Sequence, residues 1–194
     1  MNHLFILKNK KKYMVIKIDI DGVLRNILNT MCDIYNEEFC TNIKEDDVEV
    51  YYVDNFFTLI KDKLGISGIK FFFEDNGFRI FRCSKPYDGV RDAMKKLHEM
   101  GHKIVIVSFQ RSYENMVDTL EWLNSNKIYY DDICFTKNKD IVKADIMVDD
   151  NPEFLYQITD NCQAVLIDMP YNKNCGDFKR CKSFCDFVNN LEKK

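Results

Sequence analysis

The sequence predicts an α/β fold: a Rossmann-like parallel sheet with helices on both faces and a small helical cap inserted after the first strand. Three observations predict it. Short apolar runs rich in β-branched residues alternate with helical patterns, acidic residues follow two of these runs, and residues 25–85 interrupt the alternation. Alternating strands and helices of these lengths are typical of a parallel sheet covered on both faces.

The first strand is expected at Tyr13–Ile18, where the run YMVIKI leads into Asp19 and then Gly22. From Pro86 onward, helical and strand patterns alternate, and the first helix of this part stops at Gly101. The later strands are expected at residues 104–107, 133–135, 145–148 and 164–167, with one helix between the first two and another, carrying Phe184, Phe187, Val188 and Leu191 on one stripe, at the end. Three helices are thus available to cover the two faces of the sheet.

The 194 residues suit one domain with an insertion better than two independent domains. We expect residues 1–24 and 86–194 to form the sheet domain and residues 25–85 to form the cap. The cap begins with a helical pattern and continues with aromatic-rich text such as VYYVDNFF and IKFFFEDNGF. Most of these aromatic side chains are expected to form the cap's own core.

Composition excludes several classes of protein. Hydrophobic residues make up 46% and charged residues 30% of the chain, which is typical of a globular protein with a sizeable core. The net charge of −3 gives no broad basic surface, so we expect no binding to duplex nucleic acid. No apolar run is long enough to span a membrane or to act as a secretory signal, so a cytoplasmic location is expected, with most of the eight cysteines reduced.

Two acid pairs carry the strongest chemical signal. Asp19 and Asp21 follow the first strand in DIDGVL, and Asp149 and Asp150 follow a later strand in IMVDDN. Because the carboxyl ends of parallel strands meet at one edge of the sheet, the two pairs should lie in one crevice. Four carboxylates there repel one another and require a hard cation, for which Mg²⁺ is expected.

A hydroxyl and an ammonium complete the set. Ser108 ends the strand of IVIVS, and Lys139 lies ten positions before Asp149, with Lys137 and Lys143 as competitors for its role. Acid, metal, hydroxyl and lysine together are what a transferring phosphoryl group requires.

In this order, the four elements resemble the four motifs of the haloacid dehalogenase superfamily, over about residues 13–151. The chain is further similar to 5′(3′)-deoxyribonucleotidases in four places: Gly77–Phe78, KPYDGV (85–90), KADIMVDDNP (143–152) and DMPYN (168–172). Arg25 departs from that pattern, because nucleotidases often have a small residue and an acid directly after DGVL.

The resemblance implies a Mg²⁺-dependent phosphatase. Asp19 would attack phosphorus and form an aspartyl-phosphate, and Asp21 would protonate the leaving oxygen and later activate water. The carboxylates of Asp19 and Asp149 and the backbone carbonyl of Asp21 would hold Mg²⁺, with Asp150 beside them but outside the ligand set. Ser108 and Lys139 would bind the phosphoryl group.

The resemblance also implies a small phosphate ester as substrate, most simply a 5′(3′)-(deoxy)nucleoside monophosphate. Contacts to it are sought among Gln110, Arg111, Tyr51, Tyr52 and Phe78. A phosphatase for another metabolite such as a sugar phosphate, a phosphomutase and a non-catalytic binding protein with the same fold are the alternatives. A homodimer is left open.

Overall fold

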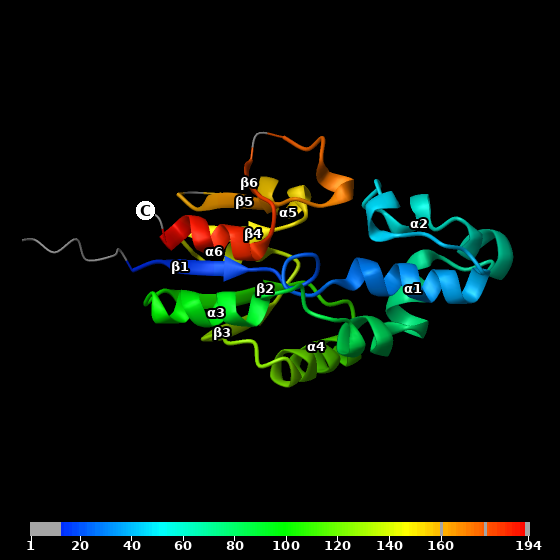
Figure 1. Ribbon diagram of the computed structural model, residues 1–194, viewed down its shortest axis with the longest axis horizontal. Coiled ribbons are helices and arrows are strands. Elements are labelled where there is room, and N and C mark those ends of the chain that lie inside the picture. The colour runs from blue at the N-terminus through cyan, green and yellow to red at the C-terminus, as the bar shows by residue number, and fades with distance from the viewer. Residues whose placement is uncertain (1–12, 160, 177, 193–194) are drawn as a thin grey trace, which may run out of the picture.

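A computed structural model describes residues 13–159, 161–176 and 178–192. Its centre is a six-stranded sheet in the order β3-β2-β1-β4-β5-β6, and all neighbouring strands are parallel (Figure 1). The strands are β1 (Val15–Ile18), β2 (Lys103–Ser108), β3 (Asp132–Phe135), β4 (Ile146–Asp149), β5 (Gln163–Ile167) and β6 (Lys179–Cys181). The predicted α/β fold class is confirmed, and β6 is an additional edge strand.

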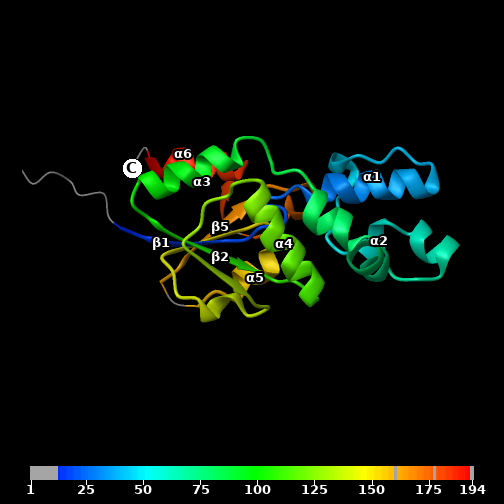
Figure 2. The same ribbon diagram turned by 90° about the horizontal axis from the view of Figure 1, so that it is seen from below.

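Helices cover both faces of this sheet, with α3 and α6 on one side and α4 and α5 on the other (Figure 2). The helices are α1 (Ile27–Phe39), α2 (Val53–Phe56), α3 (Val90–Glu99), α4 (Tyr113–Ser125), α5 (Pro152–Tyr156) and α6 (Phe184–Glu192). An ion pair of 2.7 Å between Lys96 and Glu192 joins α3 to α6. None of the helices in the described part of the chain is long and apolar enough to cross a membrane.

Strand β1 shows how the sequence places the core. Ile16 and Ile18 point into the main hydrophobic cluster with α3 and α6. Lys17 lies between them and is completely buried. Its ammonium donates to the backbone carbonyls of Lys139 (3.1 Å) and Val142 (2.9 Å), so it supports the loop before β4. Burial lowers the pKa of Lys17, and these two acceptors stabilise its proton.

Residues between β1 and α3 form a second body with its own hydrophobic cluster, beyond the carboxyl ends of the strands (Figure 1). Besides α1 and α2 it contains three π-helical segments, η2 (Ile60–Leu64), η3 (Lys70–Asp75) and η4 (Arg79–Cys83), which the sequence did not predict as such. The rings of Phe57, Phe71 and Phe72 are buried in this cluster, as expected for aromatic residues of a small core.

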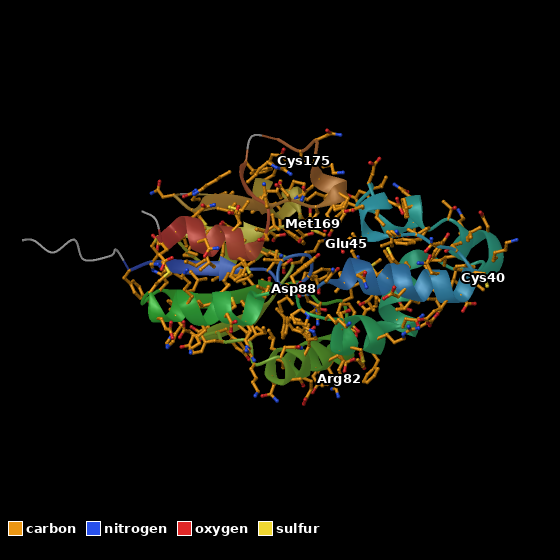
Figure 3. All side chains as sticks on the ribbon, in the orientation of Figure 1. Cys40, Glu45, Arg82, Asp88, Met169 and Cys175 are labelled. Carbon is orange, nitrogen blue, oxygen red and sulfur yellow. The ribbon has the colours of Figure 1, made fainter. Side chains whose placement is uncertain are left out.

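The chain enters and leaves this second body through two segments that are paired side by side. Arg25 and Pro86 form an antiparallel bridge. The Asn26 amide donates to the Lys85 carbonyl (2.9 Å), and the Tyr87 amide donates to the Leu24 carbonyl (3.0 Å). The two connections are thereby fixed to each other directly beside the loop that follows β1 (Figure 3 shows Asp88 at this junction).

Candidate active site

Asp19 is the first residue after β1, and it is buried. Its amide donates to the Val148 carbonyl of β4 (3.0 Å), which continues the sheet pairing by one residue and fixes the start of the loop. The loop then turns at Gly22, whose φ is +77°. A Cβ at Gly22 would lie 2.5 Å from Cγ of Asp150. Only glycine therefore allows both this turn and the close approach of Asp150.

Lys139 links the two acid pairs. Its Nζ lies 3.0 Å from Oδ1 of Asp19 and donates to Oδ2 of Asp149 at 2.7 Å. The ammonium also lies 4.2 Å from the ring centre of Phe154, and the side chain is buried. Burial opposes its charge, but the carboxylates of Asp149 and Asp19 outweigh that effect and raise the pKa of Lys139. The lysine is thus a fixed cation inside the site.

Carboxylate oxygens of Asp19, Asp149 and Asp150 all lie within 4.8 Å of one another, and all three residues are buried. Burial, together with the charges of Asp149 and Asp21, raises the pKa of Asp19 to about 7 although Lys139 opposes the shift. Burial and the charges of Asp149 and Asp19 likewise raise the pKa of Asp150 well above its ordinary range. One ammonium does not balance three such carboxylates.

A hard cation fits this arrangement. Oδ1 of Asp19 is buried and accepts no hydrogen bond of good geometry, although Lys139 lies beside it. A buried carboxylate oxygen without a donor is a natural ligand for an ion such as Mg²⁺, which prefers oxygen. The donor set of three buried carboxylates is therefore compatible with a metal site at the carboxyl edge of the sheet.

Asp149 and Asp150 differ in their surroundings. Both oxygens of Asp149 are engaged, Oδ2 by Lys139 and Oδ1 by the amide of Asn151 (2.9 Å). The carboxylate of Asp150 packs against Gly22 and accepts a hydrogen bond from the hydroxyl of Tyr171. Asp150, which we expected outside the ligand set, is thus a full member of the carboxylate cluster.

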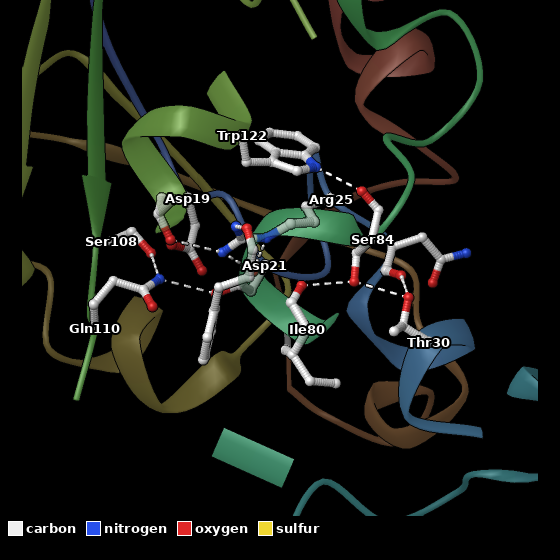
Figure 4. Close-up of polar contacts among 12 residues, drawn as sticks. Asp19, Asp21, Arg25, Thr30, Ile80, Ser84, Ser108, Gln110 and Trp122 are labelled. Atoms are coloured by element: carbon white, nitrogen blue, oxygen red, sulfur yellow. Dashed lines mark hydrogen bonds and ion pairs between the residues drawn. The ribbon is translucent and has the colours of Figure 1, made fainter. Parts of the chain in front are cut away.

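Asp21 lies in the loop after Asp19, but its carboxylate is held by other partners (Figure 4). Oδ1 accepts from Nε of Arg25 at 2.7 Å and pairs with Nη2 of the same guanidinium at 2.7 Å. Oδ2 accepts from Nε2 of Gln110 at 3.1 Å. The same Gln110 amide reaches Oγ of Ser108 at 3.3 Å, at the end of β2. The structure therefore brings Asp19, Asp21, Ser108, Lys139 and both later acids to one edge of the sheet.

The remaining candidates for substrate contacts separate into two groups. Tyr51 stacks edge-on against Tyr171 at 5.4 Å between ring centres, and Tyr52 donates its hydroxyl to Glu153 at the start of α5. Burial of its hydroxyl, followed by the charges of Asp150, Asp149 and Asp19, raises the pKa of Tyr51 well above its ordinary value. Tyr51 thus packs against Tyr171, whose hydroxyl donates to Asp150.

The other two candidates have different neighbours. Phe78 is 58% exposed and lies under the guanidinium of Arg82 (5.5 Å). Arg111 is exposed and packs over the rings of Phe73 (5.9 Å) and Phe109 (5.7 Å). These contacts do not join Phe78 or Arg111 to the carboxylates.

Three residues near the acids were not predicted to act there. Arg25 was singled out only because it departs from the nucleotidase pattern after DGVL, yet its guanidinium donates to the carboxylate of Asp21. Tyr171 and Asn172 belong to the segment DMPYN, which is similar to the corresponding segment of deoxyribonucleotidases but was given no role in the sequence analysis. The side-chain amide of Asn172 donates from Nδ2 to the backbone carbonyls of Asp150 (2.7 Å) and Ile167 (2.8 Å). It thereby fixes the loop after β4 to the end of β5. The burial of this asparagine was the missing information, and only the fold supplies it.

This sheet, with an aspartate after its first strand, a lysine and a second acid pair at the same edge, defines a hydrolase of the haloacid dehalogenase superfamily. Within it, the family described as "5′ nucleotidase, deoxy (Pyrimidine), cytosolic type C protein" matches residues 13–192, and the chain belongs to this family. The resemblance seen in the sequence is confirmed. The chain is accordingly a phosphoric monoester hydrolase of the nucleotidase type.

Individual relatives agree with this assignment. The chain is 25% identical over 168 residues to the 5′(3′)-deoxyribonucleotidase of Bacillus subtilis, covering 86% of this chain and 91% of that protein. It is 27% identical over 183 residues to the 5′(3′)-deoxyribonucleotidase of Clostridium acetobutylicum, covering 88% and 96%.

Solved structures show the same fold at low sequence identity. The L-2-haloacid dehalogenase of Xanthobacter autotrophicus superposes with a TM-score of 0.60 at 8% identity, over 93% of this chain and 99% of that one. The D,D-heptose 1,7-bisphosphate phosphatase of Burkholderia thailandensis gives a TM-score of 0.53 at 10% identity, over 94% and 100%. At these identities the likeness concerns the fold alone.

Proposed function

We propose that this protein is a Mg²⁺-dependent phosphatase of 5′(3′)-(deoxy)nucleoside monophosphates that works through an aspartyl-phosphate on Asp19. The observation that carries the proposal is the buried contact of Lys139 with both Asp19 and Asp149. An aspartate at the end of a strand, next to a fixed cation and among further carboxylates, is the arrangement that a nucleophile for phosphorus requires. The names of the relatives point to the substrate class.

For the metal, we propose Asp19 and the backbone carbonyl of Asp21 as ligands, together with an acid of the later pair. Asp149 was expected to be that acid. Its two oxygens are occupied by Lys139 and the Asn151 amide, which favours Asp150 as the ligand and Asp149 as the residue that orients Lys139. When bound, Mg²⁺ supplies positive charge to the phosphoryl oxygens and lowers the repulsion between phosphate and carboxylates.

The side chains then divide the reaction. Asp19 attacks phosphorus, the bond from phosphorus to the ester oxygen breaks, and Asp21 in its protonated form gives its proton to the leaving oxygen. Water next attacks the phosphorus of the aspartyl-phosphate, passes a proton to Asp21 and restores Asp19. Throughout, the Ser108 hydroxyl and the Lys139 ammonium hold phosphoryl oxygens.

We further propose that residues 25–85 act as a cap over a core of residues 1–24 and 86–194, of which 1–12, 160, 177, 193 and 194 lie outside the described residues. The cap lies beyond the carboxyl edge of the sheet, where it can exclude water from the acids. From the cap, Tyr51 contacts Tyr171 after β5, and Tyr52 contacts Glu153 in α5, so these two tyrosines are the best-placed substrate contacts. Gln110 is a weaker candidate because its side chain already donates to Asp21. Phe78 and Arg111 are weaker because their contacts lie with Arg82 and with Phe73 and Phe109, away from the carboxylates.

Phosphate release from a panel of nucleoside monophosphates and sugar phosphates tests the proposal, with and without Mg²⁺, for the wild type and Asp19→Asn. We expect release from nucleotides that needs Mg²⁺ and is lost in the variant. Release mainly from sugar phosphates would retain the mechanism and replace the substrate. Transfer of phosphate to a second sugar position would indicate a phosphomutase, and no release from any ester would leave a binding protein.

A further inference from the structure

We propose that Arg25 is a positioning residue for Asp21 and that it ties the orientation of this acid to the inserted segment. The inference rests on the proposed function, because it concerns the proton transfer assigned to Asp21. Its basis is a set of contacts that neither the motif nor the family description contains. They begin with a guanidinium that is completely buried.

The guanidinium makes polar contacts in three directions. Nε and Nη2 point to Oδ1 of Asp21, Nη1 donates to the Phe81 carbonyl, and Nη2 donates to Oγ1 of Thr119 at 3.2 Å. The ring centres of Phe81 and Trp122 lie 5.2 Å and 5.1 Å from its Cζ atom. A buried arginine held by these hydrogen bonds and packed against two aromatic rings has little freedom to reorient. Its charge needs a partner, and Asp21 supplies it.

The opposite oxygen of Asp21 is also held. Gln110 is buried at the end of β2, and its Nε2 donates to Oδ2 of Asp21 (3.1 Å) and to Oγ of Ser108 (3.3 Å). The carboxylate of Asp21 therefore has one oxygen on a fixed arginine and the other on a fixed amide (Figure 4). Such a carboxylate cannot rotate freely, so the direction in which it presents a proton is set by these two partners.

Arg25 also connects parts of the molecule that are distant in the sequence. Phe81 belongs to η4 in the inserted segment, and Thr119 belongs to α4 of the sheet domain. Arg25 itself forms the antiparallel bridge with Pro86 where the segment is attached. A displacement of η4 relative to α4 would consequently move the guanidinium and, with it, Asp21. The carboxyl group of Asp21 is therefore correctly oriented only when η4 of the cap lies in its described position against α4.

A purely structural role for Arg25 would give a different kinetic result. Loss of a fold-stabilising ion pair lowers the activity on all esters by the same factor. Loss of an oriented proton donor harms esters whose leaving group must be protonated and spares those whose leaving group departs as a stable anion. Values of kcat/KM report the steps up to departure of the leaving group and so isolate this effect.

The experiment compares a deoxynucleoside 5′-monophosphate with its 5′-S-phosphorothiolate, in which sulfur replaces the bridging oxygen and leaves as a thiolate. For Arg25→Met and Arg25→Lys we expect kcat/KM to fall roughly 100-fold on the oxygen ester and no more than about 5-fold on the sulfur ester. Equal losses on both esters would overturn the proposal. Far-ultraviolet circular dichroism and the melting temperature check that each variant is folded; Trp122 fluorescence is not used, because its ring contacts Arg25.

Thr119→Val is the second variant, in case Arg25 substitutions do not fold. It removes one bond of the guanidinium without touching Asp21, and we expect a smaller loss, roughly 3-fold to 10-fold, again selective for the oxygen ester. A loss that is equal on both esters would count against the proposal here as well. If the wild type hydrolyses neither ester, the proposed function fails and takes this inference with it; if the wild type is active and selectivity is absent, only the inference fails.

Discussion

Lys139 and Asp19 form a buried ion pair, with Nζ 3.0 Å from Oδ1, although one lies just before β4 and the other just after β1. Parallel pairing of β1 with β4 is what brings them together. Lys139 therefore lies beside Asp19 only in the folded protein, where its ammonium is a fixed counter-charge for the carboxylate that we propose as the nucleophile.

Asp19→Asn should abolish phosphatase activity, by at least about 10⁴-fold in kcat/KM, because the amide cannot attack phosphorus. The protein should stay folded, since the variant removes one of several mutually repelling buried acids. Phosphate release and thermal melting measure the two effects. Asp62→Asn, at an exposed aspartate of η2, is the matched control and should change neither quantity. Residual turnover in Asp19→Asn near that of the wild type would refute the assignment of the nucleophile.

Lys139→Met should lower both activity and stability. Its removal leaves Asp19 and Asp149 without their buried counter-charge, which costs about 3–5 kcal/mol in the free energy of unfolding. Denaturant unfolding without Mg²⁺ measures this loss. Lys143→Met removes a lysine whose side chain is 67% exposed and should leave the activity intact. If the two substitutions had similar effects on activity and unfolding, the role of Lys139 as the buried counter-charge of Asp19 and Asp149 would be contradicted.

Asp150→Asn and Asp149→Asn should differ in metal binding. If Asp150 is the ligand, Asp150→Asn should weaken Mg²⁺ affinity at least about 10-fold, as titration calorimetry can measure. Asp149→Asn should retain more of the affinity and lose mainly turnover, because its carboxylate holds Lys139. The reverse order of affinities would return the ligand role to Asp149, as first expected.

Gly22→Ala should be destabilising and inactive. The new methyl group would meet Asp150 at 2.5 Å, in a backbone conformation with φ of +77° that side chains rarely adopt. We expect a loss of about 2–4 kcal/mol in the free energy of unfolding, the sum of backbone strain and overpacking. Gly65→Ala is the control, since φ there is +71° but nothing lies within 4 Å of the added carbon. Gly65→Ala should carry the strain alone and keep full activity.

Cysteine reactivity should follow burial. Burial, and then the charges of Glu45 and Asp33, raise the pKa of Cys32 to about 12, so almost no thiolate exists at pH 8. Iodoacetamide should label the exposed Cys40 and Cys83 in the native protein and reach Cys32 only in denaturant. Because the thiol is buried and its pKa is raised to about 12, Cys32 should stay unlabelled even when the pH is raised toward 10, as long as the fold persists. Mass spectrometry of the labelled peptides provides the readout, and rapid labelling of Cys32 at pH 8 would show that α1 opens.

The sequence could predict what depends on local pattern. Five of the six strands are marked by runs of apolar residues and were placed to within one or two residues, and the apolar stripes of α3, α4 and α6 were recognised. Helix α5 was not predicted. Strand β6 was missed because its residues, Lys179–Cys181, include two cations and form no apolar run. Its pairing with β5 alone makes it a strand. The π-helical segments were missed for a related reason, since no side-chain period distinguishes them reliably.

The residues of the candidate site likewise fall into those marked by a local sequence motif and those that only tertiary contacts reveal. Asp19, Asp21, Ser108, Lys139 and the later acids sit within or next to short motifs, and the sheet brings them together. The contacts of Arg25 with Phe81 and Thr119 join three distant parts of the chain, so no local pattern could reveal them. Their roles in chemistry stay predictions until the variants above are measured.

The paired connections at Arg25 and Pro86 have a consequence for how such a protein can change. The chain leaves and re-enters the sheet domain at neighbouring backbone positions, where the Asn26 amide donates to the Lys85 carbonyl at 2.9 Å. We therefore expect a change in the length of the insertion to leave the strand order intact. A replacement segment would have to reproduce the contacts that tie its end to α4: the Ser84 carbonyl accepts from Nε1 of Trp122 at 2.6 Å, and Arg82 pairs with Asp118 at 2.9 Å.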